Sequence, residues 1–165
     1  MENQNIELTP GKFIKTLSLI HLAMLGGMLL FIAIAYLQTE STQLSFDYEN
    51  DIFFFLVPLL TIGGVTASFF LPNKTMQALS SESSLREKLT TYQTSSIIKY
   101  ATLEGPSLFA IVSYLQTGNM YYLIFAGALI IYFFNLKPSK FKIEMDLKLN
   151  HEHQFAFNQM DEVIK

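Results

Sequence analysis

The chain has 165 residues, of which half are hydrophobic and only 15% are charged, and it contains no cysteine. About a quarter of the residues are charged in a typical soluble domain, so this composition favours a membrane protein of one small domain. The absence of cysteine excludes disulfides and thiolate metal sites. The formal net charge of −3 is uninformative as a total, but the distribution of charge along the chain is informative. We expect no nucleic-acid partner.

The apolar residues gather into four blocks, each close to the ~20 residues that cross a bilayer core. These blocks cover roughly residues 17–37, 52–71, 97–116 and 119–136. The first is longer than a signal-peptide core, and the polar stretch QTESTQLSFDYENDI follows it in place of a small-residue cleavage site. We therefore predict four retained transmembrane spans.

The positive charges are distributed on one side of this arrangement. All eleven Lys and Arg residues lie before the first span, between the second and third, or after the fourth, with Lys99 close to the start of the third. The connections at residues 38–51 and 116–119 have none. Because positive residues are retained in the cytoplasm, we predict that both termini are cytoplasmic.

The third span is predicted to belong to one long helix that begins in the cytoplasm. Ser84 stands three residues before Glu87, which is the spacing of a helix-capping box, so we expect a helix from about Leu85 through Leu115. The QTGN turn that follows is too short for anything but an antiparallel hairpin with the fourth span.

The tail from residue 137 to 165 allows two predictions. Its segment FKIEMDLKL alternates apolar and polar residues, which is the period of a half-buried strand. Ser139 and Asn150 could instead begin two short helices. Because an isolated strand would lack a partner, we favour helix over strand for residues 139–149.

A carboxylate interrupts the third span in the stretch ATLEGPSLFAIV. Glu104 lies about 10 Å into the span at a rise of 1.5 Å per residue, where a charge costs about 2.5–3.5 kcal/mol. We therefore expect Glu104 to be either protonated or paired. Gly105 and Pro106 follow at once, and the proline frees the carbonyl of Thr102 and predicts a kink, which hydroxyls such as those of Thr102 and Ser107 could repair.

The carboxylate shares one face of the third helix with other polar side chains, so this face should look into the bundle. The positions on this face are Gln93, Tyr100, Glu104, Ser107, Ile111 and Tyr114. His21, one turn into the first span, lies at a similar depth and could share a proton with Glu104. The candidate ion- or proton-binding residues are therefore Glu104, His21, Tyr100 and Ser107. The alternative is a structural glutamate, protonated or paired with His21, that locks helix packing.

The remaining motifs provide no catalytic or metal site. His151 and His153, with Glu152 between them, lack further ligands at zinc-site spacing. The sequence contains no glycine-rich phosphate loop, nucleophile elbow or HExxH motif. We expect no cofactor and no metal, and we expect a protein that is not an enzyme; an integral-membrane enzyme that uses Glu104 with His21 is the least favoured alternative.

Two resemblances follow from these residues. The chain as a whole, with LEGPSLFAIVSYLQTGN followed by KPSK, resembles small four-span inner-membrane proteins of Bacteroidetes-type bacteria, a resemblance that implies no activity. Residues 103–112, LEGPSLFAIV, are similar to the carboxylate-bearing helix of the proteolipid ring subunit of rotary ATPases. That similarity implies a proton-carrying role for Glu104.

We therefore predict an all-α, up-and-down four-helix membrane bundle in residues 1–136 with a helical cytoplasmic tail in 137–165. The expected location is a bacterial inner membrane, with both termini inside. We expect a non-enzymatic accessory or scaffolding subunit with cytoplasmic partner surfaces, in contact with the lipid bilayer and with a homo-oligomer or larger membrane complex. The alternative is an oligomeric proton- or cation-coupled transporter or channel that uses Glu104.

Overall fold

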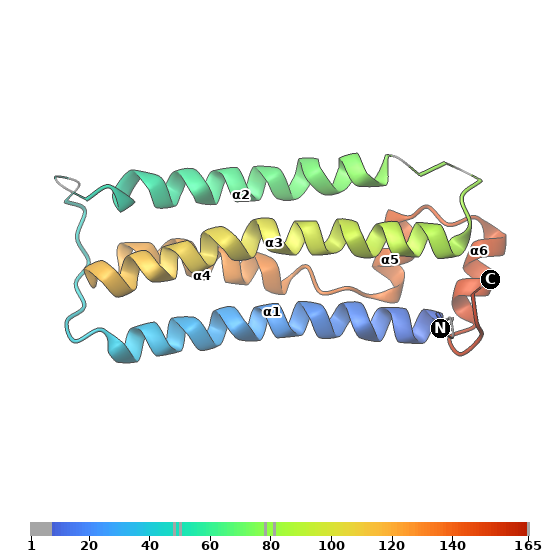
Figure 1. Cartoon of the computed structure of the whole chain (residues 1–165), viewed down its shortest axis with the longest axis horizontal. Coiled ribbons are helices and arrows are strands. Elements are labelled where there is room, and N and C mark those ends of the chain that lie inside the picture. Colours follow the sequence, from blue (N-terminus) through green and yellow to red (C-terminus); the bar gives the residue numbers. More distant parts are fainter. Residues whose placement is uncertain (1–7, 48, 50, 78, 81, 165) are drawn as a thin grey trace, which may run out of the picture.

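The computed structural model describes residues 8–47, 49, 51–77, 79–80 and 82–164. In these residues the chain forms six helices and no strand, and the all-helical prediction is confirmed (Figure 1). The helices are α1 (Pro10–Gln38), α2 (Phe53–Met76), α3 (Leu85–Thr117), α4 (Tyr121–Phe134), α5 (Lys140–Asp146) and α6 (His151–Asn158).

The four longer helices lie side by side, and α3 is the central element. In Figure 1, α2 and α1 flank α3 on opposite sides, and α4 covers only one half of its length. Helices α1, α2 and α4 all pack on α3, with the most extensive contact between α2 and α3. Leu8 and Ile164, the first and last residues that the structure describes, are joined by a hydrogen bond at one end of this bundle. We call this the basal end, and the opposite end, which carries the described residues between α1 and α2, the loop end.

The central helix has the ends that its sequence predicts. The Ser84 side chain accepts a hydrogen bond of 3.2 Å from the backbone N–H of Glu87, as expected for a capping box. At the other end, Gly118 caps the helix in the left-handed conformation with φ of 69°, which glycine adopts without a steric penalty. The predictions of a long third helix and of a tight turn to the fourth are both confirmed.

The tail is helical, so the strand alternative for residues 139–149 is wrong. Side-chain caps begin both short helices: Ser139 accepts from the N–H of Lys142, and Asn150 accepts from the N–H of His153 at 2.8 Å. The alternating apolar residues lie on a helix and do not share one buried face. Ile143 is fully buried on α5, whereas Phe141 and Met145 face outward.

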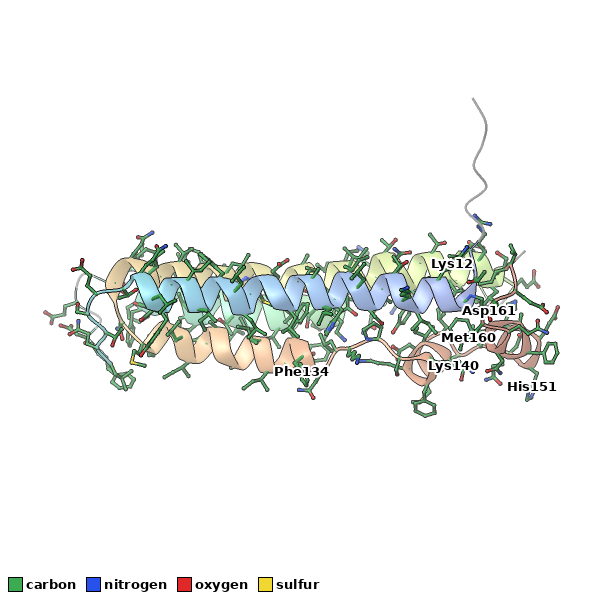
Figure 2. All side chains as sticks on the ribbon, turned by 90° about the horizontal axis from the view of Figure 1, so that it is seen from below. Lys12, Phe134, Lys140, His151, Met160 and Asp161 are labelled. Atoms are coloured by element: carbon green, nitrogen blue, oxygen red, sulfur yellow. The ribbon has the colours of Figure 1, made fainter. Side chains whose placement is uncertain are left out.

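Residues 140–164 pack against the basal ends of α1 and α3, and we call this unit the basal cap (Figure 2). Two backbone hydrogen bonds of 2.9 Å close it: Gly11 N–H donates to the Met160 carbonyl, and Ile164 N–H donates to the Leu8 carbonyl. Phe157 of α6 is fully buried in its core. The first turn of α1 and the last described residues therefore form one packed structure.

The bundle is apolar on the outside along α1, α2 and α4. Between Leu19 and Leu37 of α1, every exposed position carries an aliphatic side chain, alanine or glycine except Tyr36. We call this outer surface the apolar mantle. Its large side chains include Leu19, Leu22, Leu29, Leu30, Ile34, Leu37, Phe55, Leu59, Ile62, Phe69, Phe70, Leu71, Ile124, Ile131 and Phe134. The stretch from Leu19 to Leu37 is about 27 Å long at the helical rise, close to the ~30 Å bilayer core.

Among the described residues, α1 and α2 are the two helices that are both long and apolar enough to cross a membrane. Only 22% and 17% of their most apolar windows are buried inside the molecule, whereas the core helix of a soluble protein is mostly buried. These two helices indicate membrane association. The predicted third span is interrupted by the polar residues around Glu104, and the predicted fourth span, 119–136, contains a helix of only 14 residues. The four-span arrangement therefore stays a prediction.

Candidate functional site

Glu104 lies at the edge of the buried face of α3. It is half-buried, and its position falls between buried Ser107 and Ile111 on one side and exposed Ala101 and Gly105 on the other. No hydrogen bond or ion pair within the described part of the chain involves its carboxylate. The predicted pairing of this carboxylate with His21 is therefore not formed, because the imidazole has another partner.

His21 is buried, 3% exposed, in a cluster formed by three helices. Its ring stacks on that of Phe133 of α4 with 4.9 Å between centroids, and it meets the Tyr100 ring of α3 edge-on at 5.2 Å. The imidazole Nε2 lies 2.9 Å from the Phe133 carbonyl oxygen, and as the tautomer that carries its proton there it donates to that oxygen. The Tyr100 hydroxyl donates to the Leu136 carbonyl at 3.4 Å.

This cluster has a clear structural purpose at the end of α4. The last carbonyls of a helix lack the donors of a following turn. The Phe133 carbonyl accepts from the Leu136 N–H at 2.9 Å, and His21 is its second donor. Tyr100 supplies a donor to the carbonyl of Leu136, just beyond the end of α4. The structure thus brings His21 and Tyr100 together, but it does not join them to Glu104 or Ser107 by a hydrogen bond in the described residues. The Ser107 hydroxyl is buried without a partner.

Helix α3 is continuous through Pro106, and α2 packs against it at this position. Gly64 packs so closely that a Cβ there would overlap the Thr102 carbonyl oxygen and the Pro106 ring. The Thr102 carbonyl is the one that a proline at 106 deprives of its donor. The predicted repair by hydroxyls does not occur at this carbonyl, because the Thr102 hydroxyl donates to the Lys99 carbonyl at 2.9 Å. The sequence analysis did not identify this contact of Gly64 with α3, because no local pattern specifies which helix faces Pro106.

The described residues hold no group of three or more histidine and acidic side chains that could bind a metal ion. His153 instead accepts, at Nδ1, a hydrogen bond of 3.3 Å from the ammonium of Lys88, a residue that is almost fully buried. Burial of the imidazole and the charge of Lys88 lower the pKa of His153, against a smaller opposite effect of Glu152. This contact joins α6 to α3.

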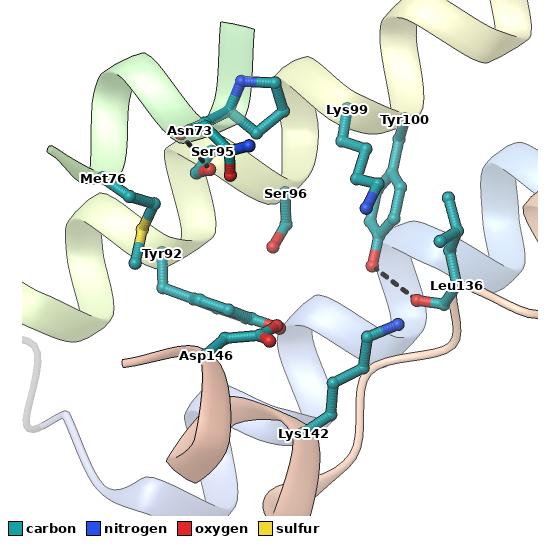
Figure 3. Close-up of a pocket in the computed structure, with 11 residues that line it drawn as sticks. Asn73, Met76, Tyr92, Ser95, Ser96, Lys99, Tyr100, Leu136, Lys142 and Asp146 are labelled. Atoms are coloured by element: carbon teal, nitrogen blue, oxygen red, sulfur yellow. Dashed lines mark hydrogen bonds between the residues drawn. The ribbon is translucent and has the colours of Figure 1, made fainter. Parts of the chain in front are cut away.

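A polar cavity of about 210 Å³ opens between the basal ends of α2 and α3 and the helix α5 (Figure 3). The Ser95 hydroxyl donates to the Pro72 carbonyl, and the Tyr92 hydroxyl donates to Asp146, both at 3.1 Å. Burial and the Asp146 carboxylate raise the pKa of Tyr92. The other polar lining groups are Asn73, Ser96, Lys99, Tyr100 and Lys142.

At the loop end, one amide side chain ties the first connection to the hairpin turn. Asn119 donates from Nδ2 to the Ser45 carbonyl at 2.9 Å, and its Oδ1 accepts from the N–H groups of Ser45 and Tyr121. The hydroxyl of Tyr122 donates to the Asp51 carboxylate in the same region. These contacts attach Ser45 and Asp51 of the first connection to Asn119 and to Tyr122 of α4.

Comparisons of this chain with protein-family models, with curated proteins and with solved structures find no match.

Proposed function

We propose that this chain is an integral protein of a bacterial inner membrane, with four spans and both termini in the cytoplasm, that serves as a non-enzymatic accessory or scaffolding subunit. The observation that carries the membrane part is the apolar mantle, because aliphatic and aromatic side chains cover the outside of α1, α2 and α4. In water so large an exposed apolar surface would drive association. In lipid it needs no covering.

The even number of spans is supported by the location of the chain ends. Both ends of the described chain lie at the basal end. Apart from Lys99, the lysines and the arginine precede residue 17, lie between residues 72 and 96, or follow residue 136. These are the parts of the sequence that lead to the basal end. Because positive residues are retained in the cytoplasm, we assign the basal end to that side. The loop end, whose residues 38–51 and 116–119 have no positive charge, faces outward.

The scaffolding role is supported by the surface of the basal cap. Phe141 of α5 and Phe155 of α6 are 71% and 68% exposed, although each belongs to a helix whose opposite side packs on the bundle. Met145 is also exposed on α5. Aromatic and methionine side chains are enriched where proteins bind one another. We assign this face as the contact with a cytoplasmic partner.

The membrane assignment is tested by extraction and by cysteine labelling. The chain has no cysteine, so a single introduced thiol reports without background. We expect the protein to resist alkaline carbonate extraction. In intact cells with a permeable outer envelope, a membrane-impermeant maleimide should label Thr42→Cys, and it should label Asp161→Cys only after the inner membrane is opened. Extraction by carbonate, or equal labelling of both variants in intact cells, would contradict the assignment.

The scaffolding role is tested at native expression by the size of the solubilised particle. We expect the protein to migrate as part of a complex larger than the monomer. The variant Phe141→Ser with Phe155→Ser should shift to the monomer position, whereas the exposed control Glu152→Ser should not. If the unchanged protein migrates as a lone monomer, or if both variants behave as the unchanged chain does, the role is excluded.

The second candidate function, an oligomeric proton- or cation-coupled transporter or channel, is favoured by the position of Glu104. Its carboxylate is half-buried and has no partner within the described chain, at a place where α3 reaches the outside of the bundle at Gly105. If several copies of the chain met along this exposed part of α3, their Glu104 carboxylates would lie close together. An ionisable group inside a membrane span is a functional candidate by default.

Liposome flux separates the two functions. The transporter predicts a pH-dependent flux that Glu104→Gln abolishes without loss of thermal stability. An absence of flux, or a flux indifferent to the substitution, would exclude transport through this group. If Glu104→Gln lowers stability instead, the glutamate is a structural residue of the α3 face.

A further inference from the structure

The polar cavity at the basal end contains two converging positive charges. Lys99 enters it from α3 and Lys142 from α5 (Figure 3), so both ammonium side chains line one cavity. The hydroxyl of Ser96 and the amide of Asn73 line the same space. The cavity therefore offers both positive charge and hydrogen-bond donors to one small anion.

Among the described residues, neither lysine forms an ion pair within 4.0 Å with a carboxylate, and Asp146 is the one acidic residue of the lining. The Oδ2 of Asp146 accepts from Tyr92. The Lys99 ammonium instead lies 5.8 Å from the centre of the Phe69 ring, a cation–π distance. With two lysines and one aspartate, the lining has a formal charge of +1. Two like charges held together are stabilised by an anion between them.

The cavity lies at the level where the surface changes from apolar to polar. On α2 the exposed apolar side chains end at Leu71, directly before the lining residues Pro72 and Asn73. On α4 the exposed apolar side chains end at Phe134, two residues before the lining residue Leu136. In the proposed membrane orientation this is the depth of the cytoplasmic lipid head groups.

We propose that this cavity binds a phosphate group, with Lys99 and Lys142 as its charged ligands. Lysine ammonium groups bind phosphate as point charges with several donors, and basic pockets between transmembrane helices on the cytoplasmic side bind phosphate-bearing lipid head groups. The phosphate can come from an anionic lipid or from the cytoplasm. The lipid source rests on the proposed membrane placement, whereas binding of free phosphate does not.

The test uses the full chain in a neutral detergent, with its melting temperature followed by circular dichroism. The probes are dioleoyl phosphatidylglycerol, dioleoyl phosphatidylcholine as its uncharged-surface control, and inorganic phosphate. We expect a saturable rise of the melting temperature with phosphatidylglycerol or phosphate and a smaller one with phosphatidylcholine. Loss of either lysine should raise the probe concentration needed for half-saturation about fivefold. A rise with inorganic phosphate identifies the free anion as ligand, and a rise with phosphatidylglycerol alone identifies the lipid.

Matched variants distinguish a site from general surface charge. Lys99→Gln with Lys142→Gln should abolish the rise, and Lys137→Gln, which removes an exposed lysine outside the cavity, should retain it. Asp146→Asn should tighten binding several-fold, since it removes the one negative charge of the lining and keeps an acceptor for Tyr92. If the double variant does not fold, Lys142→Gln alone and Asp146→Asn decide. Equal losses in Lys137→Gln and the cavity variants, no tightening in Asp146→Asn, or no rise with any probe would overturn the proposal.

Discussion

The imidazole of His21 stacks on the ring of Phe133 and hydrogen-bonds the carbonyl oxygen of the same residue. One side chain of α1 thus supports both the side chain and the backbone at the end of α4. The partner of this histidine is a helix end and not the carboxylate of Glu104.

We expect His21→Phe to lower the free energy of unfolding by about 1–2 kcal/mol. Phenylalanine preserves a flat ring against Phe133 but cannot donate to its carbonyl oxygen, which then keeps only the Leu136 N–H as donor. His21→Gln is the matched control, because its amide can donate although it cannot stack. Titration with a denaturing detergent, followed by circular dichroism, measures both. A His21→Phe protein as stable as the unchanged one would show that this hydrogen bond contributes nothing.

The two adjacent glycines of α2 should respond in opposite directions to alanine. A Cβ at Gly64 would overlap the Thr102 carbonyl and the Pro106 ring, whereas a Cβ at Gly63 meets nothing within 4 Å. We expect Gly64→Ala to cost about 1–3 kcal/mol through overpacking. Gly63→Ala should be neutral or stabilise by up to about 1 kcal/mol. The free energies of unfolding of the two variants are measured under the same conditions. Equal changes would contradict the close packing of Gly64 against α3 at Pro106.

The attachment of α6 should weaken in acid. Burial and Lys88 lower the pKa of His153 below its ordinary value of 6.5, so the folded state resists a proton that the unfolded segment accepts. The stability of the basal cap is therefore complete above about pH 6.5 and falls as the pH decreases below it. Protection of the α6 amides against hydrogen exchange, corrected for intrinsic rates, measures this fall.

Two substitutions make the acid effect specific. His153→Gln should flatten the dependence below about pH 6.5, because it removes the titrating group, whereas His151→Gln, at an exposed position of the same helix, should leave it unchanged. The same slope in the His153→Gln protein would mean that another group is responsible.

Asn119→Asp should loosen the outer connection. The carboxylate can still accept from the N–H groups of Ser45 and Tyr121, but the donation to the Ser45 carbonyl is lost. A loss of about 1 kcal/mol corresponds to roughly fivefold faster proteolytic cleavage within residues 39–52. Gln116→Glu makes the same chemical change at an exposed position of the neighbouring turn and should cleave at the original rate. If both variants cleave alike, the Asn119 contacts do not restrain the connection.

Local signals predicted the helices well because they act over three or four residues. Ser84 with Glu87, Ser139 and Asn150 each begin a helix through a side-chain hydrogen bond to a nearby N–H. The apolar blocks likewise predicted the long helices. The exception was the segment around Ile143, where an alternating pattern also places apolar residues four apart, so a strand and a helix can both bury part of it.

The sequence pattern could not predict which residues of different helices contact one another. His21 and Glu104 lie at similar depths, but depth does not specify which face of one helix meets another. The partner of His21 depends on where α4 ends, and its 14 residues are fewer than its apolar block suggests. The contact of Gly64 with the Thr102 carbonyl depends on the register of α2 along α3. The Lys99 and Lys142 cavity depends on how the tail folds back.

The hydrogen bonds that join the first turn of α1 to residues 160–164 have a consequence for biosynthesis. The ribosome makes the start of α1 first, and the residues that cover it emerge only after every other helix has been made. Phe13 and Leu17, which are buried in the finished protein, therefore receive the part of their cover that the tail supplies only after α1 to α4 have been made. Closure of the basal cap requires that the helices bring the start of α1 and residues 160–164 to the same end of the bundle.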